Sequence, residues 1–234
     1  MDFTESTFQL QKEGGITVTM FEVAEPKAIV IFAAGRGGSP SRHLPLLRAI
    51  AARGYTVAAP HFDMIPSAMP TKEQLDARIR QLEVISDEYT TAGLPVIGVG
   101  HSIGATLLLT LAGAKAITFY KESVKPQLKR NFTGLVLLAP AVDFFLHEGA
   151  SDAINTKVYL RTGAKDNVTP ADRTMMFKAM LEEHGSVNFV LDEQAGHFSY
   201  MDQLPPNVKD PQPDRHLFLE ELANDVAKFI VSLT

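Results

Sequence analysis

The sequence predicts an α/β protein in which helices cover both faces of a mostly parallel sheet. Short, continuous apolar runs, typical of strands buried on both faces, alternate with longer segments whose apolar residues recur at helical spacing. Two stretches of alternating polar and apolar residues precede this pattern and predict an antiparallel hairpin. Strands and helices that alternate in this way form right-handed crossovers, which make the main part of the sheet parallel.

The hairpin is expected to pair residues 8–11 with 16–23 across a turn at Glu13-Gly14-Gly15. Apolar runs predict the later strands at 28–33, 55–59, 95–100, 134–139, 157–161 and 187–191. Helical periodicity is found at 41–53, 72–91, 103–119, 171–184 and 214–233. No linker-like stretch divides the chain, so we expect residues 1–234 to form a single domain.

Composition excludes several classes of protein and site. The 234 residues are 45% hydrophobic and 21% charged, which is typical of a folded globule. A formal net charge of −5 argues against nucleic-acid binding, since phosphate contacts need clustered cations. The absence of cysteine excludes disulfides, thiolate metal sites and a cysteine nucleophile. The sequence shows neither a signal peptide nor an apolar run long enough for stable membrane insertion, so we expect a cytoplasmic protein.

A Gly-x-Ser-x-Gly pattern, Gly100-His101-Ser102-Ile103-Gly104, lies between a predicted strand and a predicted helix. In this context the serine occupies a tight, strained turn that lifts its hydroxyl above the sheet edge, and the glycines avoid clashes on either side. The turn also places the Ile103 amide at a helix N-terminus, where developing negative charge is favoured. Ser102 is therefore the candidate nucleophile.

A serine hydroxyl needs a base, and the base needs an orienting acid. Asp166 and His197 each follow a different predicted strand, at the sheet edge where open α/β sheets place their sites. They also stand in the order serine, acid, histidine along the chain. Asp143 is a less favoured alternative for the acid. Among the other histidines, His101 adjoins Ser102 but is expected to point away from it.

The loop after the first buried strand, at 33–39, is expected to supply a second donor to an oxyanion. We predict the Arg36 amide, with Gly35 or Gly37 as alternatives. A nucleotide-binding loop is disfavoured, because Pro40 falls where the third glycine of the dinucleotide pattern belongs.

These motifs resemble the α/β-hydrolase superfamily over nearly the whole chain. Gly-His-Ser-Ile-Gly at 100–104 resembles the elbow of lipases and esterases, while the segments at 162–170 and 195–198 resemble the acid and histidine loops. Ala34 departs from the histidine often found there. The length is similar to small dienelactone-hydrolase-like proteins, but those use cysteine, so that activity is not implied. The resemblance implies a Ser102–His197–Asp166 triad without cofactor or metal.

The expected function is hydrolysis of carboxylic esters or thioesters through an acyl-enzyme. An acyltransferase using the same triad and a non-catalytic binding protein of this fold are the alternatives. The expected partner is a small ester or thioester. Only residues 141–156 separate two strands where relatives often insert a cap, so we expect a minimal cap. Four aromatic residues are expected near the site and are candidates for the pocket or, equally, for ordinary core: Phe144, Phe145, Phe198 and Tyr200.

Overall fold

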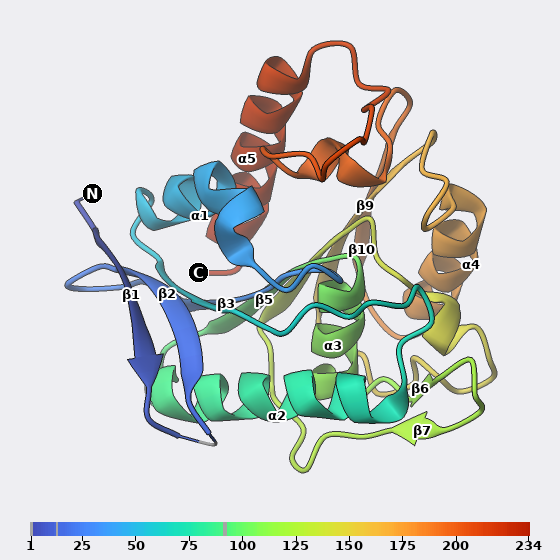
Figure 1. Ribbon diagram of the computed structural model, residues 1–234, viewed down its shortest axis with the longest axis horizontal. Coiled ribbons are helices and arrows are strands. Elements are labelled where there is room, and N and C mark those ends of the chain that lie inside the picture. The colour runs from blue at the N-terminus through green and yellow to red at the C-terminus, as the bar shows by residue number, and fades with distance from the viewer. Residues whose placement is uncertain (1, 13, 91–92) are drawn as a thin grey trace.

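One mixed sheet organises the molecule. A computed structural model describes residues 2–12, 14–90 and 93–234, and in this part eight strands follow the order β1-β2-β4-β3-β5-β8-β9-β10 (Figure 1). The strands are β1 (Thr4–Leu10), β2 (Ile16–Glu22), β3 (Ile29–Ala33), β4 (Thr56–Pro60), β5 (Val96–His101), β8 (Gly134–Leu138), β9 (Lys157–Gly163) and β10 (Val187–Asp192). The pairs β1–β2 and β2–β4 are antiparallel and the others parallel, which confirms the predicted class and hairpin.

Helices cover both faces of this sheet, as predicted (Figure 1). On one face lie α2 (Lys72–Tyr89), α3 (Ile103–Ala112) and α4 (Ala171–Glu182), whose apolar side chains share a core with alternate strand residues. On the other face α1 (Leu44–Ala51) packs beside α5 (Arg215–Val231) over a second core. Two cores thus hold the strands rigidly and fix the positions of the loops that follow them.

Local signals account for several element ends. Thr71 and Gln74 form a reciprocal capping box at the start of α2, and the Asp214 side chain caps α5 through the Leu217 amide. The helix predicted over 103–119 ends early, at Ala112, because Gly113 adopts φ 114° and closes the helix with a left-handed turn. The glutamate of the predicted hairpin turn, Glu13, and the predicted helix end at 91 lie outside the described residues.

Short elements complete the fold. A two-stranded hairpin of β6 (Ala116–Ile117) and β7 (Ser123–Val124) occupies the segment after α3. Three short 3₁₀ turns are also present in the described chain: η1 (Pro40–His43), η2 (Asp143–Phe145) and η3 (His197–Tyr200). Of these, η3 follows β10 and begins at the candidate base.

Candidate active site

Ser102 occupies a strained turn between β5 and α3. Its φ of 56° and ψ of −125° lie where non-glycine residues are rarely found. The flanking glycines are required by crowding: a Cβ on Gly100 would lie 2.7 Å from the Ala105 nitrogen, and one on Gly104 would lie 1.9 Å from the Ala33 oxygen. The local geometry thus follows from the Gly-x-Ser-x-Gly pattern, with the hydroxyl held above the carboxyl end of β5.

The structure brings Ser102, His197 and Asp166 into one hydrogen-bonded chain. Ser102 Oγ lies 3.0 Å from His197 Nε2, and His197 Nδ1 lies 2.9 Å from Asp166 Oδ2. All three residues are almost fully buried, with no more than 6% of their surface exposed. With Nδ1 donating to the carboxylate, Nε2 is left as an acceptor for the serine proton, which is the arrangement a general base requires.

The loop after β9 holds the Asp166 carboxylate firmly. Its Oδ1 accepts the amides of Val168 and Thr169 at 2.8 and 2.7 Å, and its Oδ2 accepts the Thr169 hydroxyl at 2.8 Å. Burial alone would raise the pKa of Asp166, but the hydrogen bond from His197 and the electrostatic attraction to this residue, together with the Thr169 bonds, lower it overall. Asp166 therefore stays ionised beside the imidazole.

Thr169 is a site residue that the sequence analysis missed. Its hydroxyl also lies 3.0 Å from His197 Nδ1, so it borders both the acid and the base. Its only signal in the sequence was its place in the loop between Asp166 and Pro170. The alternative acid, Asp143, lies 3.5 Å from the Arg173 guanidinium and forms an ion pair there.

The turn that carries His197 is tied to the proline-rich loop at 203–213. The Gly196 amide donates to Ser199 Oγ at 2.9 Å, and this hydroxyl donates to Asp210 Oδ1 at 2.5 Å. Asp210 also pairs with Arg215 at the start of α5. Through Asp210, the proline-rich loop therefore supports the turn that carries the imidazole.

Two further histidines lie in a row behind His197. The ring of His101 is 5.0 Å from that of His197 and 5.2 Å from that of His43, measured between centroids. His101 Nε2 lies 3.0 Å from the His197 carbonyl oxygen, so this nitrogen carries a proton and donates it. The side chain thus supports the backbone of the base.

Burial keeps both of these histidines neutral. It lowers the pKa of His43 to about 4, and burial followed by repulsion from His197 and His43 lowers the pKa of His101 well below its usual value. In the unfolded chain both would titrate near pH 6.5. The unfolded state therefore binds more protons below that pH, and acid must destabilise the fold.

We expect the free energy of unfolding to fall as the pH drops from about 6.5 toward 4. For His43 alone the loss is about 2 kcal/mol at pH 5, since each pH unit below the unfolded pKa costs about 1.4 kcal/mol. Urea unfolding at several pH values measures this slope. His43→Leu should flatten it, whereas the exposed His216→Gln should not. If the free energy of unfolding depended on pH in His43→Leu as it does in the wild type, the lowered pKa of His43 would be contradicted.

Two backbone amides are candidates for binding an oxyanion. Ile103 opens α3 directly after Ser102. Gly35, in the loop after β3, packs against the nucleophile so closely that a Cβ there would lie 3.1 Å from Ser102 Cβ. The next residue, Arg36, is exposed. The predicted donors thus come from two segments that meet at Ser102.

A cavity of about 530 Å³ adjoins the candidate base. Of the four aromatic residues named from the sequence, Phe198 lines it, while Phe144, Phe145 and Tyr200 are buried in the two cores. Tyr200 uses its hydroxyl to bond Asp192 at 2.8 Å. The lining is formed by Lys165, Asn167, Gly196, His197, Phe198, Val208, Lys209, Asp210 and Pro211.

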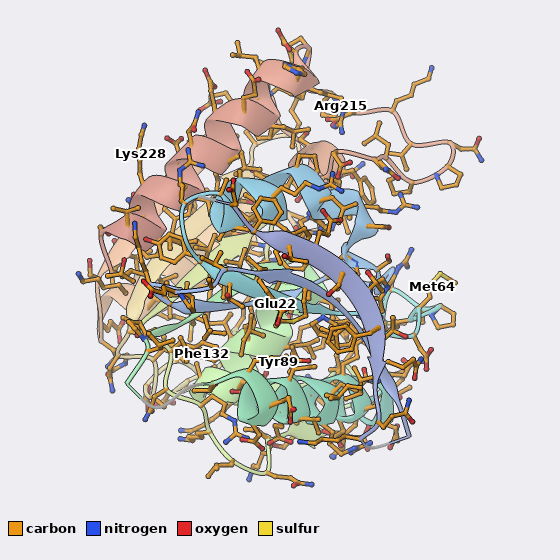
Figure 2. The ribbon with its side chains drawn as sticks, turned by 90° about the vertical axis from the view of Figure 1, so that its left-hand side faces the viewer. Glu22, Met64, Tyr89, Phe132, Arg215 and Lys228 are labelled. Carbon is orange, nitrogen blue, oxygen red and sulfur yellow. The ribbon has the colours of Figure 1, made fainter. Side chains whose placement is uncertain are left out.

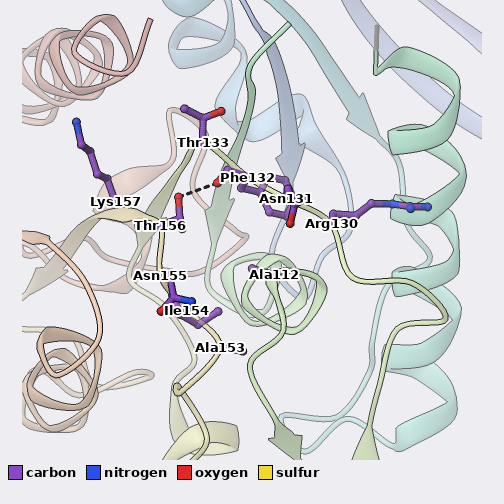
Figure 3. Close-up of a pocket in the computed structure, with 10 residues that line it drawn as sticks. All are labelled: Ala112, Arg130, Asn131, Phe132, Thr133, Ala153, Ile154, Asn155, Thr156 and Lys157. Carbon is purple, nitrogen blue, oxygen red and sulfur yellow. Dashed lines mark hydrogen bonds between the residues drawn. The ribbon is translucent and has the colours of Figure 1, made fainter. Parts of the chain in front are cut away.

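Another cavity, of about 390 Å³, lies at the opposite edge of the sheet (Figure 3). It is bordered by residues at the amino ends of β8 and β9, including Thr133 and Lys157, and by the Thr156 hydroxyl, which donates to the Phe132 carbonyl at 2.7 Å. Because the candidate triad occupies the carboxyl edge, this cavity is separate from it.

Neither a metal cluster nor a membrane-spanning helix is found among the described residues. No three His, Asp or Glu side chains among these residues come together as a possible metal site. Within the same residues, no helix combines the length and apolar character needed to cross a membrane.

Comparison with known proteins places this fold. No family model matches the sequence, and no curated protein matches it significantly. Similar solved structures include an esterase of Pyrococcus furiosus, with a TM-score of 0.66 and 14% identity over 99% of this chain and 91% of that one. A carboxylesterase of Lactobacillus plantarum has a TM-score of 0.61 and 15% identity, over 100% of this chain and 98% of that one. Thermogutta terrifontis esterase 2, phosphoramylated by tabun, has a TM-score of 0.65 and 14% identity, over 97% of this chain and 94% of that one.

Proposed function

The chain has the α/β-hydrolase fold, and we propose that it is a serine hydrolase that cleaves carboxylic esters or thioesters. The observation that carries the proposal is the continuous hydrogen-bonded chain from Ser102 through His197 to Asp166 at the carboxyl edge of the sheet. A strained serine, a base in the right tautomer and an ionised acid are the parts that acyl transfer to serine requires.

In the first half of the reaction Ser102 Oγ attacks the carbonyl carbon while His197 Nε2 takes its proton. The carbonyl oxygen gains negative charge and accepts hydrogen bonds from the Ile103 and Arg36 amides, each contributing about 3 kcal/mol to the transition state. Asp166 stabilises the imidazolium. His197 then gives its proton to the departing alcohol or thiol, and the acyl group stays on Ser102.

In the second half water repeats these steps. His197 Nε2 takes a proton from water, whose oxygen attacks the acyl carbon, and the same two amides bind the oxyanion. Collapse of this intermediate returns the proton to Ser102 Oγ and releases the carboxylic acid. The residues thereby end in their starting protonation states, so no cofactor is consumed.

The surroundings of the site favour a substrate that carries an apolar group. Only residues 139–156 join β8 to β9, which leaves no room for a large cap. Met64, on the loop after β4, is 68% exposed and projects from the surface (Figure 2), and Val168 in the acid loop is 51% exposed. Val168 on the acid loop and Phe198 in the cavity beside His197 favour an apolar acyl or alcohol group.

Turnover of p-nitrophenyl acetate and octanoate tests the proposal, with an acyl-coenzyme A thioester assayed in parallel. We expect release of the alcohol or thiol with free carboxylic acid as the acyl product. Acyl product found on an added alcohol or thiol would indicate acyl transfer instead. Folded protein that turns over none of these esters and thioesters would contradict the function.

A further inference from the structure

Arg78, on α2, is a buried arginine that binds backbone instead of a carboxylate. Its side chain reaches the loop that carries the candidate oxyanion donor. Its Nη1 donates to the Gly35 carbonyl at 2.9 Å, and its Nη2 donates to the carbonyls of Arg36 and Asp63 at 2.8 and 2.5 Å. The guanidinium also lies 5.1 Å from the centre of the Phe62 ring.

This arginine is costly to keep in place. It is 3% exposed and makes no ion pair within the described chain. Burial lowers its pKa to about 10, with the negative charge of Asp63 acting weakly in the opposite direction, so it remains cationic at neutral pH. A buried cation without a bound carboxylate costs free energy. Its hydrogen bonds to three carbonyl oxygens offset part of this cost.

The contacts fix the direction of one peptide unit. In a trans peptide the carbonyl of one residue and the N–H of the next point in opposite directions. The Gly35 carbonyl faces Arg78, so the Arg36 N–H faces away from it, on a loop whose Gly35 packs directly against Ser102. In the described chain this N–H donates to no other group, which leaves it free for a substrate oxygen.

We propose that Arg78 is a positioning residue that holds the peptide between Gly35 and Arg36 with its N–H directed into the oxyanion site. The inference rests on the proposed function for its catalytic consequence. The guanidinium acts from behind the peptide and does not touch the substrate. Its positive charge beside the carbonyl also polarises the peptide, which strengthens the N–H as a donor.

The loop keeps its turn without Arg78. Gly35 O also accepts the Gly38 amide at 3.0 Å, and Arg36 O also accepts the Ile65 amide at 3.0 Å. These bonds hold the loop but place only one other donor on the Gly35 carbonyl, so loss of the arginine should loosen and tilt this peptide without unfolding the loop. This separation makes the proposal testable by substitution.

Arg78→Met is expected to lower kcat and kcat/KM by the same factor, about 10- to 100-fold. Removal of a whole oxyanion donor costs roughly 100- to 1,000-fold, and a donor that is only less well oriented costs less. Equal losses are expected because the interaction is made in the transition state alone. A boronic acid that forms a tetrahedral adduct should bind more weakly by a similar factor. The pH dependence of kcat/KM should keep its midpoint, since the triad is untouched.

Arg130→Met is the matched control. Arg130 is also largely buried, with 14% of its side chain exposed, but it pairs with Asp87 and borders the cavity at the opposite edge. It should lose stability without loss of kcat. Arg78→Lys keeps the charge but carries its donors on a single nitrogen and not on a planar fork, so its kcat should fall between those of wild type and Arg78→Met. If Arg78→Met does not fold, Arg78→Lys is used to test the proposal in its place.

A readout independent of activity completes the experiment. Residual dipolar couplings report the direction of the Arg36 N–H, which should change in the Arg78 variant and stay unchanged in Arg130→Met. An unchanged direction in the Arg78 variant would overturn the proposal, whatever the activity. A changed direction with unchanged kcat would overturn its catalytic part. If the wild type turns over no ester but the direction changes, the proposed function fails and the positioning role stands.

Discussion

Ser102→Ala is expected to lower kcat by about 10⁶-fold, because the variant has no atom that can form the acyl-enzyme. The remaining rate would come from the oxyanion donors and substrate binding. The fold should survive, since Ser102 Oγ contacts His197 and the change removes a single atom. Steady-state turnover of a p-nitrophenyl ester measures the loss, with circular dichroism to establish folding.

Ser151→Ala is the control for this variant. Ser151 is also buried, at 2% exposure, and its hydroxyl donates to the Met180 carbonyl, away from the candidate site. Its loss should affect stability and leave kcat unchanged. Turnover near the wild-type rate in a pure, folded Ser102→Ala sample would contradict the mechanism.

Asp166→Asn is expected to lower kcat by about 10⁴-fold at neutral pH. The amide oxygen can still accept the Val168 and Thr169 N–H groups, so the loop should keep its shape. The amide NH₂, however, would donate to His197 Nδ1 and force the proton onto Nε2. His197 could then no longer accept the proton of Ser102, and the base would be lost.

Asp143→Asn provides the comparison, because Asp143 was the alternative acid in the sequence. Its ion pair with Arg173 is on the surface and should matter little for turnover, so kcat is expected to change by less than about threefold. A large loss in Asp143→Asn together with a small one in Asp166→Asn would overturn the assignment of the acid.

The sequence predicted the sheet and the elbow because both depend on local patterns. Apolar runs mark the buried strands, and the glycines at 100 and 104 are required by contacts within a few residues or with the adjacent strand. The loops of Asp166 and His197 could be placed because the carboxyl ends of parallel strands share one edge. These are properties that a single sequence carries directly.

Other features depend on side-chain direction, which pattern alone does not carry. Phe145 and Tyr200 lie near the site in the chain, yet both point into the cores. Arg78 resembles any charged residue on an amphipathic helix, and its binding to Gly35, 43 residues earlier, has no local signature. The end of α3 at Gly113 depends on one left-handed residue within a continuing apolar pattern.

Labelling by a fluorophosphonate, with the modified peptide identified by mass spectrometry, tests the central claim most directly. Only a serine activated by its neighbours reacts rapidly with this probe. We expect one adduct, on Ser102, and none after Ser102→Ala. Folded protein that forms no adduct, or forms it on another residue, would contradict the account.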